Sequence, residues 1–164
     1  MDRPKLVIGG AVCAVVLLGL GVYWWQRGPF TVYASRITNE IPVTPGTERF
    51  AARHTVADPG KFQLLIVTVK VNRGVGAMRT SDFTLRYLSN QSEQTARCSG
   101  LCPVDDPEHP GALWMVAEGN EDILVNGIKS GYLHLAFLVP LGTRTGALRF
   151  KQERIGRVEV KGQG

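Results

Sequence analysis

The chain has 164 residues and a formal net charge of +5, with 44% hydrophobic and 20% charged residues. This length and composition suit one folded domain with a buried core, and the sequence contains no internal repeat, low-complexity tract or second domain. The basic excess suits an anionic surface or an acidic partner. It lacks the interleaved aromatic residues that are typical of single-stranded nucleic-acid binding, so nucleic acid is not an expected partner.

The first element in chain order is an apolar run over residues 6–25, which contains no charged residue. As an α-helix this run would be about 30 Å long, the thickness of the hydrocarbon core of a bilayer. Tyr23, Trp24 and Trp25 fall together at its end, and such side chains prefer the membrane interface. The run predicts a single-pass transmembrane helix that acts as a signal-anchor.

The flanking charges predict the orientation of this helix, because cytoplasmic segments are enriched in Lys and Arg. Two basic side chains lie in residues 1–5, and one, Arg27, lies in the juxtamembrane residues 26–29. This bias favours a short cytoplasmic N-terminus at residues 1–5, a linker at 26–29 and an extracytoplasmic domain at 30–164. The domain would then be periplasmic or extracellular.

A cleaved secretory signal is the alternative interpretation of the same run. Signal peptides have an apolar core of about 7–15 residues followed by small residues at the cleavage site. Here the core is longer and ends in bulky aromatic residues, and the best cleavage site, at residues 32–34, lies inside an expected strand. A retained anchor is therefore preferred, with a secreted, released domain as the alternative.

The rest of the chain shows the period-2 alternation of β-strands. In residues 132–139, Leu133, Leu135, Phe137 and Val139 alternate with residues such as His134, which we expect on the outward face with Ala136. Similar patterns or apolar runs occur over residues 30–37, 65–72, 83–87, 113–117, 123–127, 148–150 and 157–160. Turn residues separate these runs, so we predict an all-β domain of seven or eight antiparallel strands in two packed sheets.

Three blocks of sequence carry a resemblance to a known family. They are KFQLLIVTVKVNRG at residues 61–74, TSDFTLRYLSNQ at 80–91, and ILVNGIKSGYLHLAFLVPLGTRTGALRF at 123–150, with Phe-Leu-Val-Pro at 137–140. Their order resembles the telokin-like, immunoglobulin-like extracytoplasmic domains of bacterial membrane-anchored proteins and lipoproteins, the DUF4352 group. The resemblance implies an Ig-like β-sandwich held outside the membrane by an N-terminal anchor, with an unknown or binding function.

Cys98 and Cys102 lie in an insertion into this family pattern, RCSGLCPVDDPEHPG at residues 97–111. On an oxidising face of a membrane, two cysteines four residues apart with a glycine between them can close a small loop, so a structural disulfide is expected. A metal-binding or redox-active pair and a pair of free thiols are the alternatives.

The same insertion contains a candidate recognition loop, formed by Asp105, Asp106, Glu108 and His109. A solvated acidic turn is preferred there over a calcium site, because the spacing matches no calcium loop. The acidic residues at 118–122 are likewise expected to point toward water. No catalytic motif is present and the three histidines lack metal-ligand spacing, so the sequence predicts no enzyme, no metal ligand and no cofactor.

Basic residues gather near the C-terminus and form a candidate basic face: Arg149, Lys151, Arg154, Arg157 and Lys161. Such a face can attract anionic lipid headgroups weakly or an acidic partner. The ordinary charged side of an edge strand, which discourages edge-to-edge association, is preferred over this binding role.

Together these patterns predict a membrane-anchored extracytoplasmic binding or assembly module, an accessory subunit of a membrane protein complex. Its expected contacts are the bilayer, through residues 6–25, and another membrane or envelope protein. An envelope redox or metal-handling protein that uses Cys98 and Cys102 is the alternative from a different class.

Overall fold

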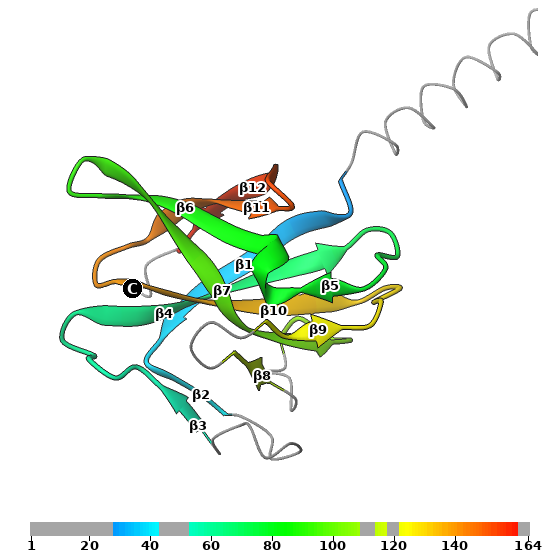
Figure 1. Ribbon diagram of the computed structural model, residues 1–164, viewed down its shortest axis with the longest axis horizontal. Helices are drawn as coiled ribbons and strands as arrows, with labels where there is room; N and C mark the ends of the chain where they lie inside the picture. The colour runs from blue at the N-terminus through cyan, green and yellow to red at the C-terminus, as the bar shows by residue number, and fades with distance from the viewer. Residues whose placement is uncertain (1–27, 43–52, 109–113, 118–121, 161–164) are drawn as a thin grey trace, which may run out of the picture.

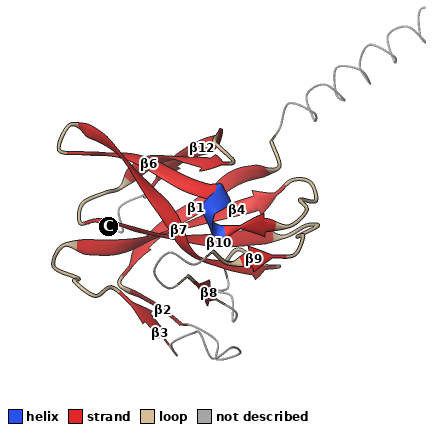
Figure 2. Ribbon diagram, in the orientation of Figure 1, coloured by secondary structure: helices blue, strands red, loops and turns tan. Residues whose placement is uncertain are grey.

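The structure is a computed structural model that describes residues 28–42, 53–108, 114–117 and 122–160. Within these ranges nearly all regular structure is β-strand (Figure 2). The elements are β1 (Phe30–Thr38), β2 (Glu40–Pro42), β3 (Arg53–Thr55), β4 (Phe62–Val71), β5 (Met78–Arg79), the 3-10 turn η1 (Thr80–Asp82), β6 (Phe83–Ser89), β7 (Ser92–Val104), β8 (Met115–Val116), β9 (Leu124–Val125), β10 (Tyr132–Pro140), β11 (Thr145–Phe150) and β12 (Glu153–Glu159).

None of the described residues forms a helix that is long and apolar enough to span a membrane. The predicted transmembrane segment at residues 6–25, with Tyr23, Trp24 and Trp25, lies outside the described residues. So do residues 1–5 and the first two residues of the predicted linker, and the membrane predictions stay predictions.

The main sheet is antiparallel and has the strand order β1-β4-β10-β7-β6-β11-β12. Its two end strands approach each other: Ser35 Oγ on β1 donates a hydrogen bond to the Glu159 carbonyl oxygen on β12, at 2.8 Å. Residues 100–104 of β7 pair with β10, whereas residues 92–97 pair with β6. The long strand β7 therefore crosses from one half of the folded sheet to the other (Figure 1). The prediction of an all-β, antiparallel domain is confirmed.

The larger core fills the space between the two halves of the sheet. It buries alternate residues of the strands, including Leu133, Leu135, Phe137 and Val139 as predicted. Phe30 packs edge-on against Phe83 and Phe150, with ring centroids 5.4 and 5.0 Å away. This aromatic cluster ties the start of β1 to the β6–β11 pair.

A second core covers the opposite face of β4 and β10. This core contains even-numbered residues of β4 and β10, such as Ile66 and Ala136. Packed onto them are Ile41 of β2, Val116 of β8 and Trp114, which directly precedes β8. The expectation that His134 and Ala136 face water was wrong: their exposed fractions are 2% and 0%. His134 stacks on Trp114, with ring centroids 6.0 Å apart, and its Nδ1 lies 2.9 Å from Thr68 Oγ1.

Candidate functional site

The prediction of a Cys98–Cys102 disulfide was wrong, because both cysteines are free and buried within β7. Gly100 lies opposite Ala136 and Cys98 opposite Phe137, so Ser99 is an extra residue in the ladder, a β-bulge. The bulge reverses the alternation of side chains. Cys98 therefore packs in the larger core, whereas Cys102 packs in the second core.

The environment of Cys98 weighs against redox chemistry at this residue. Its Sγ donates a hydrogen bond to the Gly100 carbonyl oxygen at 3.0 Å. Burial raises the pKa of the thiol from 9.0 to about 12, more than the backbone hydrogen bonds lower it. A neutral, buried thiol is a poor nucleophile and a poor metal ligand.

The candidate recognition loop begins where β7 ends. Asp105, Asp106 and Glu108 are exposed there, and the Glu108 backbone N–H donates to Asp106 Oδ1 at 2.9 Å, whereas His109 lies outside the described residues. Glu108 also borders a hollow of about 290 Å³ beside β1, which reaches the buried His134. No three potential metal-ligating side chains come together in the described parts of the chain.

In the acidic segment at residues 118–122, Asp122 is exposed as expected, but its carboxylate also has hydrogen-bond partners in the protein. Its carboxylate accepts hydrogen bonds from Ser81 Oγ at 2.6 Å, from the Ser81 N–H at 2.9 Å and from Thr80 Oγ1 at 3.0 Å. These hydrogen bonds, with that from the Ser81 hydroxyl the strongest, lower the pKa of Asp122. This carboxylate has a structural role, because it holds the turn η1 against the segment before β9.

The basic residues identified from the sequence only partly come together. Arg149, Arg154 and Arg157 lie on β11 and β12, where Arg149 is opposite Arg154 and Ala147 is opposite Arg157. Lys151 occupies the turn between the two strands, with its Nζ 5.3 Å from the centre of the Phe150 ring. Lys161 lies outside the described residues.

Two further arginines, which the sequence pattern did not single out, complete this surface. In β6 and β7 the buried Leu85 and Ala96 face the larger core, so the neighbouring Arg86 and Arg97 project from the opposite side of the sheet. Thr84 pairs with Arg97 on one side and with Arg149 on the other, which places the three side chains in one cross-strand row. We call the set of five the arginine face: Arg86, Arg97, Arg149, Arg154 and Arg157.

The arginine face is sparsely neutralised. Arg86 Nη1 lies 3.3 Å from Glu93 Oε1, and Arg157 Nε lies 3.9 Å from Glu159 Oε2. Arg97, Arg149 and Arg154 have no ion pair with any described residue. Neighbouring strands thus carry an excess of positive charge on one side of the sheet.

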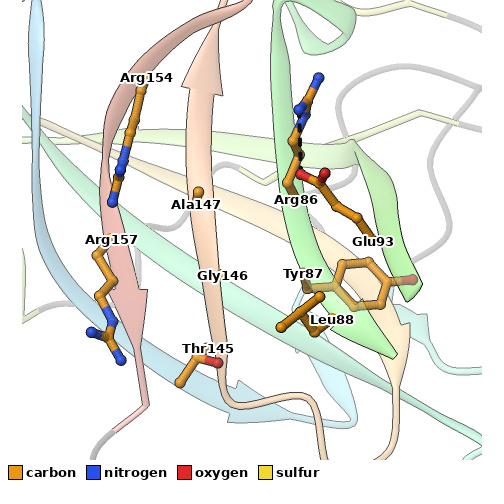
Figure 3. Close-up of a pocket in the computed structure, with 9 residues that line it drawn as sticks. All are labelled: Arg86, Tyr87, Leu88, Glu93, Thr145, Gly146, Ala147, Arg154 and Arg157. Atoms are coloured by element: carbon orange, nitrogen blue, oxygen red, sulfur yellow. Dashed lines mark hydrogen bonds and ion pairs between the residues drawn. The ribbon is translucent and has the colours of Figure 1, made fainter. Parts of the chain in front are cut away.

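The arginine face borders an open hollow of about 360 Å³, shown in Figure 3. Arg154 and Arg157 of β12 lie on one side of it, and Arg86 of β6 and Glu93 of β7 lie on the other. A guanidinium group offers several N–H donors in a planar fork, which matches a carboxylate or a phosphate. The surface is therefore suited to bind anionic groups.

Comparison with known proteins identified no matching family model, no similar curated protein and no similar solved structure. The chemistry of the candidate site therefore follows from its own geometry.

Proposed function

We propose that this chain is a membrane-anchored extracytoplasmic module with an Ig-like β-sandwich, which binds or assembles with an acidic partner through the arginine face. The observation that carries this proposal is the gathering of five arginines from four adjacent strands on one side of the sheet. The partner would be another membrane or envelope protein, and the chain would act as an accessory subunit.

The arginine face is not explained by the protection of an edge strand. Charged side chains on edge strands discourage edge-to-edge association. Arg86 on β6 and Arg149 on β11 each have a paired residue in the strand on either side. Like charges directly opposite each other, such as Arg149 and Arg154, destabilise a sheet. Arginines at doubly paired positions, one of them directly opposite another arginine, support a binding role.

The point at which the chain enters the domain is compatible with a lateral contact. Asn72, just after β4, donates through Nδ2 to the Gly28 carbonyl oxygen at 3.1 Å, so the chain enters the domain at this end. β1 then runs from this end along the domain (Figure 1), and the strands that carry the arginine face belong to the same sheet. Tethering raises the effective concentration of such a side surface for proteins anchored in the same membrane.

The anchor is tested by carbonate extraction of membranes that contain the full chain. We expect the protein to stay in the membrane pellet at its full mass, because the apolar run contributes about −3 to −6 kcal/mol to insertion. The double variant Leu17→Arg/Leu18→Arg should be extracted, since two central arginines cost about 5–7 kcal/mol. Extraction of the unaltered protein at a reduced mass would instead support the secreted, cleaved form.

The binding role is tested with the full chain in neutral lipid nanodiscs and a fluorescent polyglutamate peptide. The triple variant Arg97→Gln/Arg149→Gln/Arg154→Gln should weaken binding by a factor of about ten or more, with a steep loss at high salt in the unaltered protein. The control Arg73→Gln/Arg79→Gln/Arg144→Gln removes the same charge from exposed sites outside the face. Equal losses in both variants, or no binding by the unaltered protein, would contradict the proposal.

A further inference from the structure

The hollow beside the arginine face arises where two hairpins separate. The β6–β11 ladder runs from the Phe83–Phe150 pair to the Arg86–Ala147 pair and ends there. β6 continues to pair with β7 as far as Ser89, and β11 continues to pair with β12 as far as Thr145. Beyond Arg86, therefore, β6 and β11 border the hollow without forming a ladder with each other in the described structure.

The approach of the two strands at the start of the hollow is close. A Cβ atom at Gly146 would lie 2.8 Å from the Arg86 carbonyl oxygen and 2.9 Å from Leu85 Cδ1. β6 and β11 therefore separate just past this point, and Tyr87, Leu88 and Thr145 line the hollow between them. The facing edges of two strands are the surfaces to which an extended peptide adds as a further strand.

The side chains around the hollow combine positive charge with an exposed apolar group. Arg86, Arg154 and Arg157 line it, and Leu88, which is 74% exposed, lies beside them (Figure 3). Arginine and exposed apolar side chains placed together are typical of protein interfaces. A peptide matches this lining better than a phosphate-rich ligand, because a peptide can place an apolar side chain against Leu88.

The two ion pairs near the hollow are exchangeable. The Arg86–Glu93 and Arg157–Glu159 pairs join exposed side chains, and such pairs contribute only about 0–1 kcal/mol. A carboxylate of a ligand can therefore replace Glu93 at Arg86 at little cost. Arg154, which has no ion pair with a described residue, is available without any exchange.

We propose that the hollow between β6 and β11 binds an extended acidic segment of a partner protein. Its carboxylates pair with Arg154 and Arg157 and compete with Glu93 for Arg86, while an apolar residue of the segment contacts Leu88. This inference rests on the proposed function, since it assigns the partner chemistry and the docking point of the arginine face. Glu93 is then an internal competitor that weakens binding.

The experiment measures binding of a labelled peptide of alternating Glu and Val by fluorescence anisotropy, with the full chain in neutral nanodiscs. The peptide in which Gln replaces Glu should bind at least ten times more weakly. Arg157→Gln should weaken binding of the acidic peptide about fivefold to tenfold, and Glu93→Gln should tighten it about threefold. The control Asp58→Asn removes one charge from another exposed, ion-paired carboxylate, which does not line the hollow, and should change binding by less than a factor of two.

The outcomes separate this inference from the proposed function. If the Arg97/Arg149/Arg154 variant loses polyglutamate binding but Arg157→Gln and Glu93→Gln leave the alternating peptide unaffected, the face binds anions and the assignment to the hollow is wrong. If tripolyphosphate or vesicles of anionic phospholipid bind with this dependence on Arg157 and Glu93 and the peptide does not, the peptide assignment is overturned. If no anionic probe binds, both proposals fail.

Discussion

The substitution Gly131→Ala is expected to lower the free energy of unfolding by about 2–4 kcal/mol, because two unfavourable effects act at this residue. Gly131 has φ +93°, a backbone conformation that residues with a Cβ atom disfavour. A Cβ atom there would also lie 2.8 Å from the Val104 carbonyl oxygen, on the neighbouring strand β7. The backbone has little freedom to move away, since the Gly131 carbonyl oxygen accepts a hydrogen bond from the Val71 N–H at 2.9 Å.

Substitutions at two other glycines separate the effect of the positive φ from the effect of the close Cβ contact. Gly142 has φ +82°, but a Cβ atom there would meet only open space, so Gly142→Ala should cost only about 1–2 kcal/mol. Gly76 has neither a positive φ nor a close neighbour, and Gly76→Ala should change stability by less than about 1 kcal/mol. Chemical denaturation measures all three. A Gly131 variant that is as stable as the Gly142 variant would contradict the close packing of this turn against β7.

The second large effect is a loss of stability at alkaline pH that depends on Cys98. The pKa of its thiol is about 12 in the folded protein, above its ordinary value of 9.0, because the site is buried. The folded state therefore holds the proton more tightly than the unfolded state. This contribution is fully present below pH 9 and is lost between about pH 9 and 12, by roughly 1 kcal/mol per pH unit.

The matched variant is Cys98→Ala, which removes the titrating group. Its stability at pH 7 should be lower because it leaves a small cavity, but its stability should fall less steeply between about pH 9 and 11 than that of the unaltered protein. Tyrosine and lysine titration is common to both proteins and cancels in the comparison. Parallel pH profiles would show that Cys98 is not buried as a neutral thiol, and a disulfide with Cys102 would give that result.

The alternation of side chains was sufficient to predict most strands of the main sheet and the larger core, but β7 (Ser92–Val104) was not predicted as a strand. Leu133, Leu135, Phe137 and Val139 are buried together, because a regular strand places every second residue on one face. The second core could not be predicted in this way. Several of its residues, such as Ile41 and Trp114, are distant in sequence from β4 and β10 and belong to short or irregular segments, so no local pattern indicates their contact.

The disulfide predicted between Cys98 and Cys102 was also wrong because of a structural feature that the local sequence pattern does not indicate. Strict alternation would place residues four apart on the same face, but the bulge at Ser99 separates them into two cores. The sequence Cys-Ser-Gly-Leu-Cys was interpreted as a flexible loop because of its glycine. Gly100 instead allows close approach of β8, since a Cβ atom there would lie 3.1 Å from the Met115 carbonyl oxygen.

The candidate site was predicted only where it is continuous in sequence. Arg149, Arg154 and Arg157 were identified as one basic cluster from their proximity along the chain. Arg86 and Arg97 were not singled out, because only the strand order places β6 and β7 beside β11. The register that aligns Arg97, Thr84 and Arg149 is a tertiary property, and it has no signature in a single sequence.

The contact between β1 and β12 has a consequence for the order of folding. Ser35 and Glu159 are separated by 124 residues, so the two ends of the sheet meet only when nearly the whole domain is available. Contacts of such long sequence separation carry a large loop-closure entropy and slow the folding of β-proteins. Because the chain is synthesised from its N-terminus, it can complete this domain only after β12 has been made. Until then the side of β1 that contacts β12 would stay uncovered, and such transiently exposed strand surfaces favour aggregation.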